Sequence, residues 1–219
     1  MKTIFILINS LLFSWSLYGQ AMKLNKLLIA KLDSIKTDDQ KYRLQIDGID
    51  KKYGRESREM KALWKIIKEK DSINLIKVTA ILDNYGWLGA DVVGEDGNTT
   101  LFLVIQHSNF STQKKYLPTM REAVKNGQAK GSELALLEDR VALHEGKKQI
   151  YGSQIGRDIE TNLYYVLPLE DPDHVDQRRA EVGLPSMAVN LSNWQIKWDV
   201  DQYKKDLPNI EAKTKVKNN

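Results

Sequence analysis

The sequence predicts a mainly α-helical protein, a bundle-like array of helices with one small β-hairpin or irregular segment. Apolar residues recur in several segments at the i, i+3, i+4, i+7 spacing of an amphipathic helix. The apolar share of 42% and the charged share of 28% are ordinary for a globular chain. The best candidate for a hairpin is 157–169, where two tyrosines and a valine precede Pro168. We expect a single domain over residues 22–203, followed by a charged flexible tail at 204–219.

Residues 1–20 differ from the rest of the chain. Lys2 precedes an apolar run over 4–17, and a small residue, Gly19, follows. This pattern is typical of a secretory signal peptide cut near Gly19 or Gln20. The alternative is an N-terminal membrane anchor, but the run falls short of the roughly twenty residues that a span requires. We expect a secreted or periplasmic protein without a membrane span after cleavage. The lack of cysteine excludes disulfides and an anchor attached through cysteine.

Helical patterns and connections alternate through the first seventy or so residues. A first helix is expected over 22–47, and a second helix over 57–70. Residues 48–56 between them are polar and contain Gly48 and Gly54, which predicts a loop.

A third helix is expected to begin at a cap, Asp71 or Ser72, and to end at Gly86. The segment 86–97 that follows is rich in glycine and predicts a loop. The next run, 101–107, is almost entirely apolar and fits a buried strand or a buried helix. We favour a helix for this run, because a second helical pattern follows it.

The second half of the chain carries stronger signals for helix starts and ends. A serine, or an aspartate before a proline, is a common start, and glycine is a common end. On these signals, with a turn at 127–131, helices are expected after Ser111, from Ser132 to Gly146, from Asp171 to Gly183 and over 186–203.

Charge and residue spacing argue against several classes of partner. The 33 basic and 29 acidic residues are interspersed, and a net charge of +4 is typical of a solvated surface rather than a nucleic-acid-binding stripe. The glycines of 86–97 match neither a dinucleotide-binding motif nor a P-loop. The histidines lack the spacing of a metal site. We expect no nucleic-acid partner, no cofactor and no metal, and the class of any protein partner stays open.

Polar side chains concentrate at 139–154, after a helix that is largely apolar. Asp139 lies between two alanines on its helical face, which leaves room for a partner. Earlier in the chain, Asp39 and Arg43 are four residues apart and can pair on one face of a helix.

A set of short polar motifs occurs in order along residues 35–187. The motifs are Asp39-Gln40-x-x-Arg43, Gly86-Trp87, Gln106-His107, Asp139-Arg140, Gln149-x-Tyr151-Gly152-Ser153-Gln154, Asp171-Pro172, Val175-Asp176-x-Arg178-Arg179 and Gly183-Leu184. Together they resemble an uncharacterised bacterial family, a domain of unknown function. Two positions depart from the family pattern: Leu88 stands where a proline is usual, and Ser153 stands where a threonine is usual. The resemblance implies that these scattered polar residues belong to one pattern, and it implies no reaction.

One interpretation of these residues is a polar pocket. His107 would act as general base or acid, Asp139 would orient it, and Tyr151 would be a second proton donor. Arginine binds carboxylates and phosphates through paired hydrogen bonds, which fits a small polar or anionic ligand. The expected binding residues are Arg43, Gln106, Arg140, Gln149, Gln154 and Arg179. With this pocket, the protein is a hydrolase-like or transferase-like enzyme acting on a polar substrate.

The other interpretation is a buried network. Gln, His, Asp, Arg and Tyr side chains are costly to bury unless they are paired, and a paired network fixes how helices pack. The protein would then be a non-catalytic module that binds a ligand or a protein.

Overall fold

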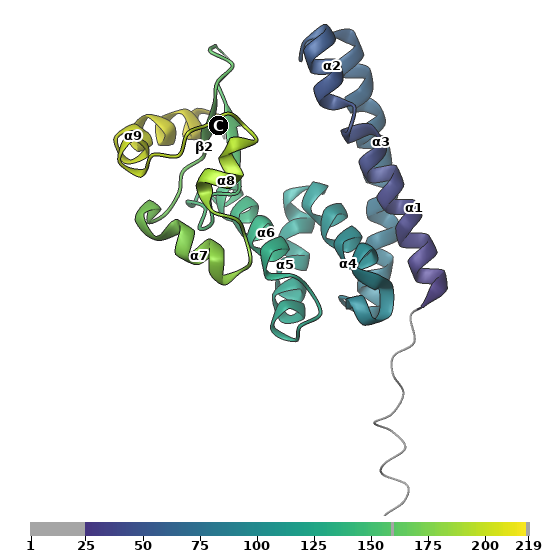
Figure 1. Cartoon of the computed structure of the whole chain (residues 1–219). Coiled ribbons are helices and arrows are strands. Elements are labelled where there is room, and N and C mark those ends of the chain that lie inside the picture. The colour runs from purple at the N-terminus through teal and green to yellow at the C-terminus, as the bar shows by residue number, and fades with distance from the viewer. Residues whose placement is uncertain (1–24, 159, 218–219) are drawn as a thin grey trace, which may run out of the picture.

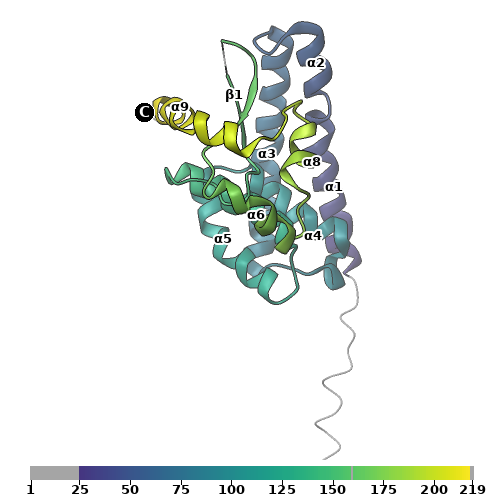
Figure 2. The ribbon, with the colours of Figure 1, turned by 60° about the vertical axis from the view of Figure 1, so that its left-hand side comes forward.

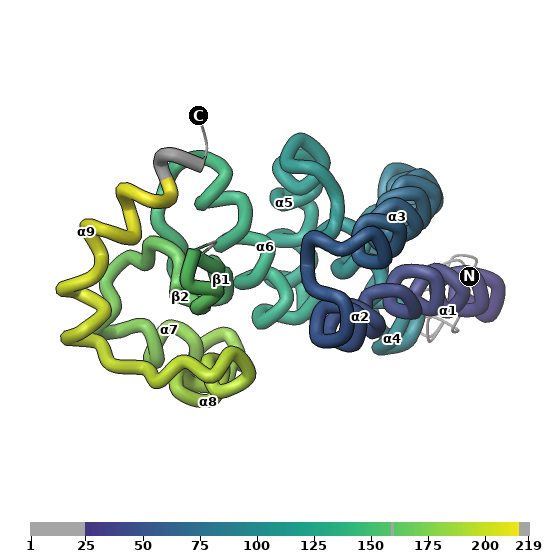
Figure 3. Tube along the Cα trace, turned by 90° about the horizontal axis from the view of Figure 1, so that it is seen from above, coloured from purple at the N-terminus to yellow at the C-terminus, as the bar shows by residue number. Residues whose placement is uncertain are grey.

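The computed structural model describes residues 25–158 and 160–217, and it confirms the mainly α-helical class. The predicted signal peptide at 1–20 lies outside the described residues. The helices form an N-terminal, a central and a C-terminal group, which stand side by side in Figure 1 and again from above in Figure 3. Among the described residues, no helix combines the length and the apolar character that crossing a membrane would require.

The N-terminal group contains α1 (Lys26–Arg43), α2 (Ile46–Tyr53) and α3 (Arg58–Tyr85). The loop predicted over 48–56 is wrong for most of its length, because α2 occupies it. Two isoleucines of α2 pack, partly buried, against a small apolar cluster on α3. This burial outweighs the cost of about 1 kcal/mol that a glycine imposes on a helix interior.

Helix α3 is continuous where the sequence predicted two helices meeting at Asp71 or Ser72. Neither side chain caps a helix start. The carboxylate of Asp71 accepts a hydrogen bond of 2.8 Å from Arg43 of α1, and the hydroxyl of Ser72 donates to the carbonyl of Lys68 at 2.9 Å. The predicted helix cap is therefore absent, and Asp71 pairs with a side chain of another helix instead.

The central group contains α4 (Ala90–His107), α5 (Phe110–Lys125) and α6 (Gly131–His144). The apolar run at 101–107 is helical, as we favoured. The glycine-bearing segment before it is not wholly a loop, because α4 already begins at Ala90 and is only interrupted at Gly94 (φ 73°, ψ 166°). That positive φ is one that glycine adopts readily.

The main core joins the N-terminal and central groups. Figure 2 shows α4, α5 and α6 beside the column of α1 and α3. Side chains from all five of these helices are completely buried in one apolar cluster, and they include Leu32, Val78, Leu101, Met120 and Leu137. This cluster holds the C-terminal end of α4 and the whole of α6 in place.

The C-terminal group begins with an antiparallel hairpin, β1 (Ile155–Arg157) and β2 (Tyr164–Val166), close to the predicted position. It continues with a short 3-10 turn and further helices around a second apolar cluster. These elements are η1 (Pro172–His174), α7 (Val175–Glu181), α8 (Met187–Ser192) and α9 (Val200–Lys217).

Helix α9 occupies most of the segment 204–219 that we expected to be a flexible tail. The hydroxyl of Tyr203 anchors it, accepting from the backbone N–H of Leu169 at 2.7 Å and donating to the carbonyl of Leu167 at 3.0 Å. Apolar residues one and two turns further along α9 pack against the second cluster. The segment that we expected to be a flexible tail is helical as far as Lys217, because its charged sequence also carries an apolar helical stripe.

Candidate functional site

The carboxylate of Asp139 on α6 is completely buried and binds the backbone of the loop that follows the helix. It accepts hydrogen bonds from the N–H groups of Ile150 (2.7 Å), Tyr151 (3.0 Å) and Ser153 (2.9 Å). Charge-assisted hydrogen bonds of this kind are the strong ones in proteins. All three of these bonds hold the backbone of the loop, and no hydrogen bond or ion pair joins Asp139 to His107.

Two more of the predicted binding residues, Gln149 and Arg179, are buried and form hydrogen bonds with backbone groups in and around the same loop. Gln149 donates to the carbonyls of Leu167 (2.9 Å) and Gln154 (3.1 Å), and its Oε1 accepts from the N–H of Gln154 at 2.8 Å. Arg179, only 1% exposed, donates to the carbonyls of Tyr151 and Pro185, both at 2.5 Å. Both side chains are paired with backbone groups.

The backbone conformation and the close packing at position 152 require a glycine at the centre of this loop. The φ of Gly152 is 65°, and a Cβ there would lie 2.7 Å from the sulfur of Met187.

The neighbouring Tyr151 side chain is half-buried. Desolvation, with the nearby charges of Glu138 and Asp139, raises the pKa of the Tyr151 phenol, so it remains protonated at neutral pH.

His107, at the end of α4, pairs with a different aspartate from the one we expected. Its Nδ1 lies 3.0 Å from Oδ1 of Asp39 on α1, a carboxylate that is 1% exposed. Arg43 lies 3.6 Å from the same oxygen, which confirms the predicted pairing of Asp39 with Arg43, and it also bonds to Asp71. A hollow of about 320 Å³ opens beside His107, and Ser72 also lines it.

The environment of Asp39 favours its ionised form. Burial opposes ionisation, but the hydrogen bond from His107 and the charges of His107 and Arg43 outweigh it, so the pKa of Asp39 lies below its ordinary value. Asp39 therefore carries a negative charge that ties α1 to the end of α4.

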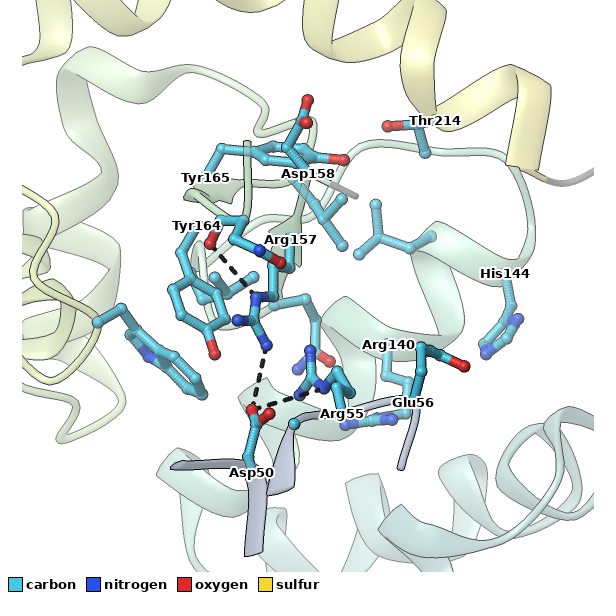
Figure 4. A pocket seen from close by; sticks show the side chains of 18 of the residues that line it. Asp50, Arg55, Glu56, Arg140, His144, Arg157, Asp158, Tyr164, Tyr165 and Thr214 are labelled. Atoms are coloured by element: carbon cyan, nitrogen blue, oxygen red, sulfur yellow. Dashed lines mark hydrogen bonds and ion pairs between the residues drawn. The ribbon is translucent and has the colours of Figure 1, made fainter. Parts of the chain in front are cut away.

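A cleft of about 1180 Å³ lies between the α2–α3 connection, the end of α6 and the hairpin. Figure 4 shows its side chains, which come from segments far apart in the sequence. Of the predicted site residues, only Arg140 and Gln154 line it. Sequence reasoning missed the others, which include Asp50, Arg55, Arg157, Tyr164 and Trp194. The one available signal was the arginine and tyrosines of the predicted hairpin.

Arg140 differs from the other arginines of the cleft because its charge is uncompensated. Arg157 and Arg55 share the carboxylate of Asp50, at 3.2 and 3.9 Å. Arg140 forms no ion pair with any residue that the structure describes, and its buried Nε has no hydrogen-bond partner there. Desolvation lowers the pKa of this guanidinium, although it stays charged at neutral pH.

Two amide side chains bind the same carbonyl group of α6, one from the end of α4 and one from the loop after α6. Gln106 and Gln154 both donate to the carbonyl of Leu136 on α6, each at 3.5 Å, one helical turn before Arg140. The buried Oε1 of Gln106 has no hydrogen-bond partner among residues 25–158 and 160–217. Gln106 thus joins Arg140 and Gln154 on one side of α6.

Residues 27–197 match a protein family described as a family of unknown function, DUF6624. The chain belongs to DUF6624. No curated protein and no solved structure matches it. The motifs that suggested this family therefore separate in a DUF6624 chain into distinct places. Asp39 and Arg43 meet His107, whereas Asp139 and the glutamine–tyrosine–glycine motif form the loop after α6.

Replacing Asp139 by Asn tests the role of the buried carboxylate. One amide oxygen cannot serve all three N–H groups, and the amide NH₂ faces donors. We expect the free energy of unfolding to fall by about 2–4 kcal/mol, measured by urea denaturation with the fold checked by circular dichroism. Asp33→Asn on the exposed face of α1 is the control and should change little. An Asp139→Asn protein as stable as the wild type would contradict this account.

Replacing Asp39 by Asn tests the charge at the α1–α4 contact. A lowered folded-state pKa stabilises the fold at pH values above the ordinary carboxyl pKa, and this contribution disappears as pH falls through the folded-state value. We therefore expect the variant to be less stable than the wild type at pH 7. The difference should shrink as urea denaturation is repeated below about pH 4. A difference that stayed constant down to pH 2.5 would show that the charge is not the cause.

Proposed function

We propose that this chain is a non-catalytic binding module that holds a small anionic ligand in the cleft. The observation that carries the proposal is the uncompensated guanidinium of Arg140 on the cleft wall. A carboxylate or phosphate accepts two parallel hydrogen bonds from such a group. The anion would supply the negative charge that neighbouring side chains do not.

Energetics support this role for Arg140 over a structural one. Removing an unpaired charge from water lowers the stability of a fold by several kcal/mol, so charged groups that are buried in proteins are usually paired. Groups kept at a cost to stability are common at functional sites. The cleft also has the size and the mixture of aromatic and polar walls that ligand sites have.

The catalytic interpretation needed His107, Asp139 and Tyr151 to share one open cleft. His107 pairs with Asp39 of α1, whereas the carboxylate of Asp139 is closed off by backbone amides, including that of Tyr151. This geometry does not favour catalysis by the three residues acting together.

A second candidate function rests on the pairing of His107 with Asp39 beside the smaller hollow. A buried carboxylate that orients a partly exposed histidine is an arrangement suited to proton transfer in a hydrolase or transferase.

A screen with chromogenic esters and phosphate monoesters tests this candidate. His107→Gln should lower any activity found by about a hundredfold or more. His174→Gln, an exposed histidine that pairs with Asp171, should leave it unchanged. Activity that survives His107→Gln would exclude the candidate.

Replacing Arg140 by Met tests the proposed binding site. We expect titration calorimetry with a panel of sugar acids, dicarboxylates and nucleotides to find an anion that binds saturably, and the variant should bind it about tenfold to a hundredfold more weakly. The melting temperature should stay the same or rise, because an unpaired and partly buried charge is removed.

Arg121→Met is the matched control, because Arg121 lies on α5, pairs with Glu138 and does not line the cleft. Binding of the selected anion should be unchanged in this control. Unchanged binding in Arg140→Met, or a large loss of its stability, would contradict the proposal.

A further inference from the structure

We infer that the ligand of the cleft is a short acidic saccharide, with a carboxylate at Arg140 and a sugar ring against Trp194. The inference rests on the proposed function and adds the chemical class of the ligand. It follows from the aromatic wall, the balance of charge and the span of the cleft.

Trp194 offers a flat apolar surface inside a cleft whose walls are partly aromatic and partly polar. It lines the cleft and remains 41% exposed. Tyr164 supports it, with ring centroids 5.1 Å apart and the planes tilted by 54°. Arg157 lies over the ring of Tyr164 at 5.2 Å, so the tyrosine is held in place and Trp194 has the accessible ring. A rigid, exposed aromatic ring suits the C–H face of a sugar, which is apolar while its hydroxyls remain polar.

When the charged side chains of the cleft are paired, one positive charge is left without a partner, and a ligand with one negative group would match it. Three arginines line the cleft, together with the carboxylates of Asp50, Glu56 and Asp158. Asp50 pairs with two of the arginines, Asp158 pairs with Lys213 at 2.5 Å, and Glu56 lies 3.9 Å from Lys61. The uncompensated cation is Arg140. A single carboxylate matches it, whereas a phosphate chain would bring several negative charges close to these acids.

The ligand must be longer than one ring. In Figure 4, the ion-paired group of Asp50, Arg55 and Arg157 lies between Tyr164 and Arg140. A molecule that reaches from Arg140 to the aromatic wall has to cross that group. The volume of about 1180 Å³ also exceeds what a single small ring would fill.

The side chains along this path suit hydroxyl groups. Gln154 and Asn162 present amides, and Asp50 presents a carboxylate. Sugar hydroxyls both donate and accept hydrogen bonds, so they can satisfy amides and charged groups alike. An aromatic carboxylate of similar length has no hydroxyl groups to form hydrogen bonds with these side chains, which disfavours it.

Titration calorimetry of the full protein with a disaccharide of galacturonic acid tests the inference. We expect saturable binding, with little or no binding of lactose, which is neutral, and of adenosine monophosphate. Arg140→Met should weaken binding of the acidic disaccharide at least tenfold. Trp194→Leu, which keeps apolar packing against Tyr164, should weaken it about threefold to tenfold.

Trp64→Leu is the control, because Trp64 is a comparably exposed tryptophan on α3 outside the cleft. Its binding should equal that of the wild type, and circular dichroism should show all variants folded. The disaccharide should also change tryptophan fluorescence in the wild type and the Trp64→Leu variant, but not in Trp194→Leu.

The outcomes separate this inference from the proposed function. If adenosine monophosphate or another anion binds through Arg140 and the acidic disaccharide does not, the saccharide is wrong and anion binding stands. If the disaccharide binds equally well to wild type and Trp194→Leu, the ring contact is wrong. If no anion binds in a way that depends on Arg140, both proposals fail.

Discussion

The C-terminal half of this protein depends on a single buried carboxylate. Asp139 accepts three backbone hydrogen bonds from the loop that follows α6, and this loop leads from the main core to the hairpin and the second apolar cluster. Three buried donors without an acceptor would each cost about 1–3 kcal/mol. Gln149 and Arg179 secure the same loop by binding further backbone groups. The position of the hairpin relative to α6, and hence the shape of the cleft, follows from these contacts.

Asp139 and Arg140 are consecutive residues of α6, but their side chains lie in different environments. Asp139 and Arg140 differ by about 100° around the helix axis. The carboxylate turns into the loop and is fully paired, whereas the guanidinium lies on the cleft wall without a counter-charge. The two charges do not pair, because adjacent side chains on a helix point in different directions. The same rigid element thus supplies the anchor of the fold and the group that we propose for ligand binding.

His107 shows where reasoning from sequence reached its limit. The histidine, both aspartates and the arginines could be selected as polar residues of one family pattern. Their pairing could not be predicted, because Asp39 and Asp139 are equally acceptable partners for an imidazole. The packing of α1 against α4 selected Asp39, which is 68 positions away in the chain. The cleft residues Asp50, Arg157 and Trp194 were missed for the same reason, since they become neighbours only when the loop after α6 brings the hairpin close to α2.

The sequence by itself determined the features that depend on neighbouring residues. It predicted the mainly helical class, the helical state of the run at 101–107, the small hairpin and the Asp39–Arg43 pair, because periodicity and spacing of a few residues act within one element. Only the tertiary structure decided that α3 is continuous, that α9 continues to Lys217, and which polar side chains are sealed and which face the cleft. These outcomes depend on contacts between distant segments, where burial and hydrogen bonding outweigh the local preference of the chain.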